Sequence, residues 1–292
     1  MNITLCEVGP RDGFQFEPKL IPTELKLEVI QALVDAGLPE VQIASFVHPK
    51  WVPQMADAEA VCAGAPEGRA VYTGLALNQK GVERARDAGL KHVDLSISTN
   101  PTHSRDNANM TLDEAVAQMC GMVQLCHESG LEARAGLQCV WGYKAPGDTP
   151  IERILDMSRQ IVELNVESLS LADSTGMANP AAMKETLRAV QEVAGDTPLV
   201  LHLHDTRGLG MANVVAALEC GVTRFDTAFG GLGGCPFIPG ATGNIATEDT
   251  VYLLDSLGLN TGIDLEAVAA VSRRMEAFLE KPFSGKMYRL VG

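Results

Sequence analysis

The segment SLSLADSTGMANPAAMKETLRAVQEVAGDTPLVLHLHDTRGLGMANVVAALECG, residues 168–221, contains the pattern that decides the fold. Two short apolar strands, SLSLAD and PLVLHLHD, are each followed by a segment with the apolar spacing of an amphipathic helix. The phrases LADSTGMAN (171–179) and LHDTRGLGMAN (203–213) repeat one order of strand, Asp, polar turn, Gly and helix start. Strands that alternate with helices are typical of a parallel sheet that is covered by helices.

The same alternation extends over the rest of the chain. The segments that are read as strands are ITLCEV, EVQIAS, AVYTGLAL, HVDLSIS, EARAGLQCV, SLSLAD, PLVLHLHD and RFDTAFG, and each precedes a helical pattern. Eight such units favour an α/β fold closed into a (β/α)8 TIM barrel over an open doubly wound sheet. We expect one catalytic domain over residues 1–292, in which 264–292 form a C-terminal helical extension that includes an additional helix.

Composition narrows the class of partner. The chain has 292 residues, 46% of them hydrophobic, with a net charge of −14. Because nucleic-acid binding depends on clustered Lys and Arg, this acidic balance predicts no nucleic-acid partner. The seven cysteines contain no CxxC pair, so reduced thiols are expected. The N-terminus lacks the pattern of a signal peptide and no apolar run is long enough for a membrane span, which predicts a cytoplasmic protein without membrane contact.

Two histidines stand one residue apart in the seventh predicted strand. His202 and His204 are expected on one face of that strand, with Leu201 and Leu203 on the opposite face. Two imidazoles that converge in this way can bind a divalent metal ion. A polar strand end whose histidines are simply hydrogen-bonded explains the same pattern equally well, so the stretch alone leaves both interpretations open.

Other polar residues follow the ends of the first and sixth predicted strands, where a barrel of this type carries its active site. Arg11 and Asp12 lie between Gly9 and Gly13, so a sharp turn can present both side chains, although an exposed ion pair explains them as well. Asp173 either orients a neighbouring group or caps the following helix, and the cap is the stronger interpretation for this residue alone.

A glycine-rich loop, residues 228–244, follows the last predicted strand. Cys235 lies within it and is a candidate acid, base or nucleophile on a mobile lid. Asn244 closes the loop as a helix cap, a metal ligand, or both. Asp12, His202, His204 and Asn244 together supply two nitrogens and two oxygens, a set that suits six-coordinate Mg²⁺ or Mn²⁺ better than a closed zinc site.

At these residues the sequence resembles 3-hydroxy-3-methylglutaryl-CoA lyase and the related metal-dependent TIM-barrel lyases and condensing synthases. The resemblance is carried by EVGPRDG (7–13), SFVHPKWVPQM (45–55), LHLHDT (201–206) and GGLGGCP with GATGNIATEDTVYLL (230–254). It implies a carbon–carbon lyase that uses a divalent metal, Mg²⁺ or Mn²⁺, and an acyl-CoA thioester. The products implied are acetyl-CoA and a keto acid, which is acetoacetate for the standard substrate.

The resemblance also implies a role for each candidate residue. The metal ligands would be Asp12, His202, His204 and Asn244. Arg11 would stabilise the enolate oxygen that forms on the thioester, Cys235 would take part in proton transfer, and Asp173 would support the site from the sixth strand.

Several positions depart from the family pattern near strand ends. Phe16 and Pro18 replace an Asn and a Lys, Gln42 stands where the family usually has a Glu, and Trp141, Tyr143 and Lys144 replace a Gly-Cys-Pro-Tyr segment. Gln42 is predicted in the barrel interior near the metal, where it either affects catalysis or fills the core as a neutral hydrogen-bonding residue. With Phe16 and Trp141 shaping the pocket, these changes predict a preference for another 3-hydroxyacyl-CoA.

Three alternatives remain beside the standard lyase. They are cleavage of a different 3-hydroxyacyl-CoA, a Claisen-type acyl-CoA condensation on the same scaffold, and a catalytically silent barrel retained for binding. The Cys235 lid and the lack of a C-terminal regulatory domain favour the lyase, and the intact ligand set argues against a silent barrel. The oligomeric state stays open, with a homo-oligomer as one alternative.

Overall fold

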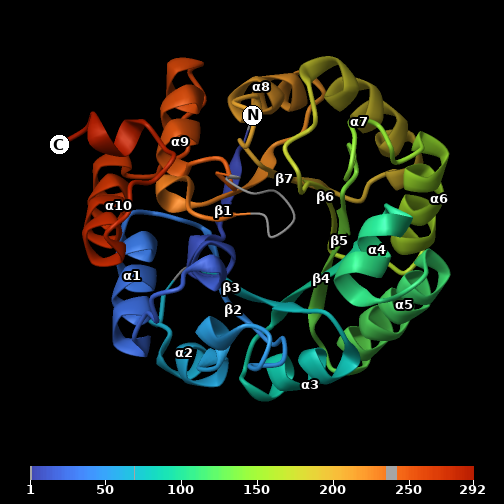
Figure 1. Cartoon of the computed structure of the whole chain (residues 1–292), viewed down its shortest axis with the longest axis horizontal. Helices are drawn as coiled ribbons and strands as arrows, with labels where there is room; N and C mark the ends of the chain where they lie inside the picture. The colour runs from blue at the N-terminus through green and yellow to red at the C-terminus, as the bar shows by residue number, and fades with distance from the viewer. Residues whose placement is uncertain (1, 69, 235–241) are drawn as a thin grey trace.

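A computed structural model describes residues 2–68, 70–234 and 242–292 as a closed barrel surrounded by helices (Figure 1). Parallel strands pair in the order β1-β2-β3-β4-β5-β6-β7-β8, and β8 pairs with β1 to close the sheet. The strands are β1 (Thr4–Glu7), β2 (Glu40–Ser45), β3 (Val71–Ala76), β4 (His92–Ser98), β5 (Glu132–Gln138), β6 (Ser168–Asp173), β7 (Leu199–Leu203) and β8 (Arg224–Thr227). The predicted TIM barrel is therefore confirmed.

Helices form the outer ring of the molecule (Figure 1). They are α1 (Thr23–Asp35), α2 (Ala58–Gly64), α3 (Gln79–Asp87), α4 (Pro101–Ala108), α5 (Leu112–Glu128), α6 (Ile151–Val162), α7 (Pro180–Ala194), α8 (Gly210–Glu219), α9 (Thr247–Ser256) and α10 (Leu265–Leu279). The additional helix expected near the C-terminus is α10, which packs beside α1 and α9. Among the described residues, no helix combines the length and apolar character that crossing a bilayer requires.

Helix α4 was not expected from the sequence. It follows β4 directly and begins at Pro101, a residue suited to the first helical position. Asn100 caps it, because its Oδ1 accepts hydrogen bonds from the backbone N–H groups of Thr102 and His103, 3.0 and 3.1 Å away. Polar residues dominate this helix, so it lacks the apolar spacing that identifies the other helices.

The two faces of the strands have different characters. Residues facing the helices, such as Leu137, Leu171 and Leu203, are fully buried in the main core between sheet and helices. Side chains facing the barrel axis include the charged residues Asp94 and Arg134, with side chains nine-tenths or more buried. Since barrel interiors are usually filled by branched apolar side chains, this interior is unusually polar.

A buried carboxyl group supports the glycine-rich turn after β8. Glu248, at the start of α9, accepts hydrogen bonds from the backbone N–H of Gly230, 2.8 Å away, and from the hydroxyl of Ser272 on α10. Gly230 has φ 62°, and a Cβ there would lie 2.3 Å from the Phe283 ring, so this turn requires glycine. Burial raises the pKa of Glu248 from 4.5 to about 7.

This raised pKa leads to a testable pH dependence of stability. Between about pH 4.5 and 7 the folded chain holds a proton that the unfolded chain has released, so Glu248 lowers the free energy of unfolding as the pH rises. Glu248→Gln cannot titrate, so its free energy of unfolding should fall less between pH 5 and pH 8, by up to about 3 kcal/mol. Urea unfolding of both proteins at the two pH values measures the difference, and identical losses would contradict the prediction.

Candidate active site

A cavity of about 870 Å³ opens at the end of the barrel where the strands finish, and the predicted site residues meet there. Arg11, Asp12, Gln42, His202 and His204 all line it. Arg11 and Asp12 come from the short helical turn that follows β1, and each is only 7% exposed. They are therefore part of a buried site, and the alternative of an exposed ion pair is wrong.

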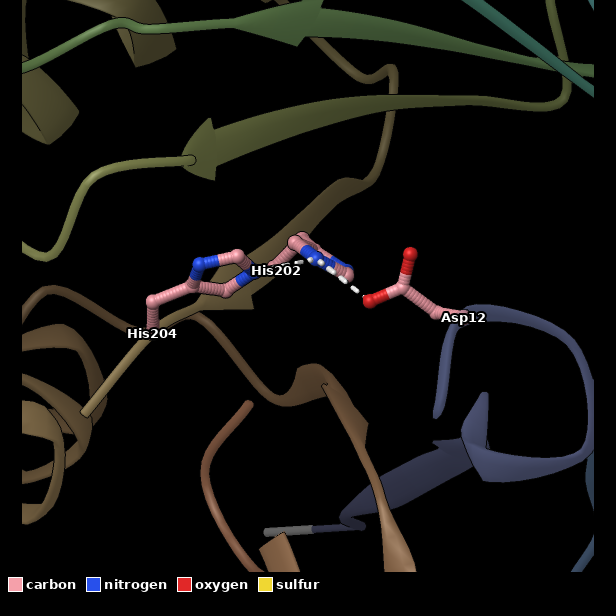
Figure 2. Close-up of side chains that lie close together, drawn as sticks. All are labelled: Asp12, His202 and His204. Carbon is pink, nitrogen blue, oxygen red and sulfur yellow. Dashed lines mark hydrogen bonds and ion pairs between the residues drawn. The ribbon is translucent and has the colours of Figure 1, made fainter. Parts of the chain in front are cut away.

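Three of the predicted metal ligands converge in this cavity. Figure 2 shows Asp12 facing His202, with His204 beside His202 at the end of β7. One ligand atom from each residue lies within 4.8 Å of the other two. Nε2 of His202 is 3.2 Å from Nε2 of His204 and 3.9 Å from Oδ2 of Asp12. Two imidazole nitrogens and a carboxylate oxygen facing one small space make a possible metal-binding triad.

Asn244 lies next to this triad and fits the same site. Its Nδ2 donates to Oδ2 of Asp12 at 2.7 Å and to the carbonyl oxygen of Leu232 at 3.0 Å. Its Oδ1 is buried and has no hydrogen-bond partner among the described residues. A buried amide oxygen without a partner costs free energy that a bound cation would recover, so the residues present suit a hard divalent ion.

The protonation of the ligands agrees with metal binding. Burial, with the neighbouring His202, lowers the pKa of His204 to about 4, which keeps this imidazole neutral near pH 7. Burial acts to raise the pKa of Asp12, but the Arg11 guanidinium and the two histidines outweigh it and lower that pKa. A neutral imidazole and an ionised carboxylate are the forms that bind a cation.

Asp226 on β8 orients His202 and was missed by sequence reasoning. Its Oδ2 lies 3.1 Å from Nδ1 of His202, which leaves Nε2 of that ring directed at the triad. Such a carboxylate behind a histidine is the usual second partner of a metal-binding imidazole. Although burial acts to raise the pKa of Asp226, the Arg134 guanidinium and His202 lower it to about 2.

A chain of buried polar contacts connects Asp226 with the turn after β1. Arg134 on β5 donates to Asp226 at 2.7 Å and also forms an ion pair with Asp94 on β4. Gln42 on β2 donates to Asp94 and accepts from Nε of Arg11. The contacts thus run from His202 around the barrel interior to Arg11, whose Nη1 donates to Oδ1 of Asp12 at 2.5 Å. The sequence carried a signal for these contacts, because they involve charged residues in the middle of otherwise apolar strands.

Replacing Asp226 tests its contact with His202. Asp226→Asn keeps the shape but replaces one of the two acceptor oxygens with an N–H donor, so either His202 or Arg134 loses its acceptor and Mn²⁺ affinity should fall by about 10–100-fold. The variant should also lose about 3–5 kcal/mol of stability, because the buried Arg134 loses one of its two carboxylates. Mn²⁺ titration and thermal unfolding measure both effects, with the exposed Asp196→Asn as the control. Unchanged Mn²⁺ affinity would remove Asp226 from the site.

The structure places the remaining candidates differently. Asp173 is buried on the outward face of β6, and its carboxylate accepts from the backbone N–H groups of Met177 and Ala178 at 2.8 and 3.1 Å. Burial raises its pKa to about 6. Asp173 is absent from the described cavity lining, so it acts on the turn beside the site rather than inside the cavity. Cys235 lies outside the described residues.

Of the positions that depart from the family pattern, some line the cavity and others do not. Phe16 and Gln42 line the cavity, whereas Pro18 is not among the described lining residues. Trp141 is buried, and its Nε1 lies 3.4 Å from the carbonyl oxygen of Ala182, which accepts its hydrogen bond. The Tyr143 hydroxyl donates to Asp106 at 2.8 Å, and Lys144 pairs with the same carboxylate at 3.4 Å. The described cavity lining does not include Trp141, Tyr143 or Lys144. The loop after β5 that carries them turns away toward α4 and α7.

Comparison with known proteins shows which family the chain is similar to. A family model described as HMGL-like matches residues 2–275. Hydroxymethylglutaryl-CoA lyase YngG of Bacillus subtilis (strain 168) is 39% identical over 286 residues, which cover 98% of this chain and 96% of that protein.

Solved structures show the same similarity. The crystal structure of the Bacillus subtilis HMG-CoA lyase superposes with a TM-score of 0.95 at 38% identity, covering 99% of this chain and 97% of that one. An HMG-CoA lyase from Acinetobacter baumannii, in complex with coenzyme A and 3-methylmalate, has a TM-score of 0.93 at 36% identity, covering 99% and 94%. The family model and these relatives show that the chain belongs to the HMGL-like family and is a carbon–carbon lyase.

Proposed function

We propose that the chain cleaves a 3-hydroxy-3-methylglutaryl-CoA-like thioester, in a reaction that depends on a divalent metal. The products are acetyl-CoA and a keto acid, which is acetoacetate when the substrate is 3-hydroxy-3-methylglutaryl-CoA itself. One observation carries the proposal: Asp12, His202 and His204 converge in the cavity that also contains the fixed guanidinium of Arg11. The relatives named HMG-CoA lyases, one of them bound to coenzyme A, support the choice of substrate.

Asp12, His202, His204 and Asn244 are the proposed ligands of Mg²⁺ or Mn²⁺. Four nitrogen and oxygen ligands leave positions free in a six-coordinate ion. When bound, the cation would polarise the C3 hydroxyl group of the substrate and favour loss of its proton. His202 is oriented for this by Asp226, and Asp12 is held by Arg11 and Asn244.

Arg11 is the proposed stabiliser of the charge that develops on the thioester. Its Nε and Nη1 are engaged by Gln42 and Asp12, and no hydrogen bond from Nη2 to a described residue is present. The guanidinium plane is therefore fixed, with one edge left to a substrate oxygen in the cavity. A fixed donor facing an enolate oxygen lowers the barrier by about 3–4 kcal/mol.

The proposed bond changes balance as follows. The C3 hydroxyl transfers its proton to solvent water, the C2–C3 bond breaks, and C3 becomes the ketone carbon. The electron pair of that bond moves to C2 as the enolate of the acetyl thioester, which then accepts a proton. We assign this last proton transfer to Cys235 on the strength of the resemblance, and Asp173 positions the adjacent turn after β6.

Gln42 provides a test of how the altered pocket chooses its substrate. Gln42→Glu would place a carboxylate beside Nε of Arg11 at the cavity wall, where it can accept the proton that the substrate hydroxyl loses, which an amide cannot do. We expect the turnover efficiency for 3-hydroxy-3-methylglutaryl-CoA to rise about tenfold relative to a thioester with another C3 group. Initial rates with both substrates in both proteins measure the ratio. An unchanged ratio would show that Gln42 only fills the core.

The main experiment is acetyl-CoA release from a panel of 3-hydroxyacyl-CoA thioesters, with Mg²⁺ or Mn²⁺ added and with a chelator as the control. Metal-dependent release from 3-hydroxy-3-methylglutaryl-CoA or a close homologue supports the proposal. Release from none of the thioesters would overturn it, and formation of a longer acyl product from acetyl-CoA and a keto acid would favour the condensing alternative.

A further inference from the structure

One wall of the cavity is built from unusually small side chains. Ser96 on β4 pairs with Gly136 on β5, and Gly136 pairs with Ser170 on β6, so the three residues form one row across adjacent strands. All three line the cavity. A barrel interior of this type normally carries bulky branched residues at such positions. The row therefore leaves open space inside the barrel, which we call the Ser-Gly-Ser pocket.

The surroundings of the Ser-Gly-Ser pocket define what can enter it. Leu75 and Ala172 also line the cavity and add apolar surface from β3 and β6. Arg134 lies two residues before Gly136 on β5, and among the described residues it is the one cationic side chain near this row. Asp94 and Asp226 both form ion pairs with it. Because that positive charge is already neutralised by two carboxylates, an anionic group gains nothing there. The surroundings of the pocket therefore favour an uncharged occupant.

The catalytic residues stand on different strands from this pocket. Arg11 and Asp12 follow β1, and His202 ends β7, whereas the row lies on β4, β5 and β6. A thioester whose reacting carbons are held by Arg11 and the triad therefore has another part of its acyl group available for the pocket. The cavity of about 870 Å³ is large for a small-molecule site, since such sites span about 300–1,000 Å³.

We propose that the Ser-Gly-Ser pocket binds an uncharged alkyl or alkenyl chain on C3 of the substrate, longer than a methyl group. This inference rests on the proposed lyase function and specifies its substrate class. Gly136 is the decisive position, because it lacks the side chain that would otherwise occupy the middle of the row.

The test compares 3-hydroxy-3-methylglutaryl-CoA with 3-hydroxy-3-hexylglutaryl-CoA as substrates. Acetyl-CoA release with Mn²⁺ gives kcat/KM for each, and the hexyl-to-methyl ratio is the readout. We expect the wild-type hexyl-to-methyl ratio to be about ten or more, because one methylene group that gains packing contacts is worth about 10–200-fold in kcat/KM.

Variants that fill the pocket should reverse this preference. In Gly136→Ala the new Cβ would lie 3.1 Å from the Leu95 carbonyl oxygen and 3.4 Å from Oγ of Ser96, so only a small adjustment is needed. Ser170→Leu extends from the neighbouring strand into open space. Each should lower the hexyl-to-methyl ratio by about tenfold or more. Ser256→Leu is the matched control, because Ser256 is exposed at the end of α9 and the same substitution there should keep the wild-type ratio.

The outcomes separate the inference from the proposed function. A wild-type enzyme that prefers the methyl substrate, or filled variants that keep the wild-type ratio, would overturn the Ser-Gly-Ser pocket while leaving the lyase intact. A wild type that binds Mn²⁺ but cleaves neither thioester would overturn the proposed function. If Gly136→Ala fails to fold, as judged by circular dichroism, Ser170→Leu decides, because its added atoms enter the cavity.

Discussion

His202→Ala and His204→Ala are each expected to lower Mn²⁺ affinity by more than about 100-fold, because each removes a proposed direct ligand, and loss of a residue that only supports a ligand typically costs about 10–100-fold. Turnover should fall by about a thousandfold, which corresponds to about 4 kcal/mol of transition-state stabilisation. The barrel should remain folded, since both side chains face the cavity rather than the core between sheet and helices. Isothermal titration with Mn²⁺ and the acetyl-CoA release assay measure the two losses.

His127→Ala is the control for these variants, because His127 is an exposed histidine on α5. It should keep wild-type Mn²⁺ affinity and turnover. A His202 or His204 variant that binds Mn²⁺ as tightly as the wild type would show that the two histidines are only a hydrogen-bonded strand end, and the proposed ligand set would fail with it.

Arg11→Lys is expected to lower kcat by about 10²–10³-fold, the cost of removing one fixed donor from a developing oxyanion. Lysine keeps the positive charge but not the planar fork with which Arg11 contacts Gln42 and Asp12 while leaving Nη2 to the substrate. The KM for the thioester should change little, because the lost contact matters most in the transition state. Steady-state kinetics at saturating Mn²⁺ separate kcat from KM.

The exposed Arg153→Lys on α6 serves as the control and should retain wild-type kinetics. If Arg11→Lys raised KM while kcat stayed constant, Arg11 would only bind the substrate. Near-normal values of both constants would remove Arg11 from the reaction altogether.

Much of the fold was predictable because its signals are local. The alternation of Leu201 and Leu203 with His202 and His204 correctly assigned one face of β7 to the core and the other to the cavity. Helix α4 was not predicted because its apolar spacing is weak, although Asn100 and Pro101 mark its start. A cap and a proline identify where a helix can begin, but without an apolar face they do not show that one follows.

The site was predictable only in part, because its supporting contacts join distant strands. Asp12 and the two histidines were expected at one end of the barrel because they stand at strand ends, whereas their role as metal ligands was implied by the family resemblance. Asp226 and Arg134 did not, since a charged residue within an apolar strand does not reveal which residue across the barrel will neutralise it. Trp141 was placed at the pocket on sequence position alone, whereas the structure turns its indole toward α7.

The ion pair between Arg134 and Asp226 joins residues 92 positions apart, and it has a consequence for how a nascent chain matures. During synthesis the N-terminal part emerges first, so β1, β4 and β5 exist before β8 does. Until β8 arrives, β1 lacks a neighbour on one side, Arg134 lacks its second carboxylate, and His202 lacks the carboxylate behind its ring. A single late strand supplies all three, so we expect barrel closure and completion of the proposed metal site to occur together, and a chain truncated before residue 224 to achieve neither.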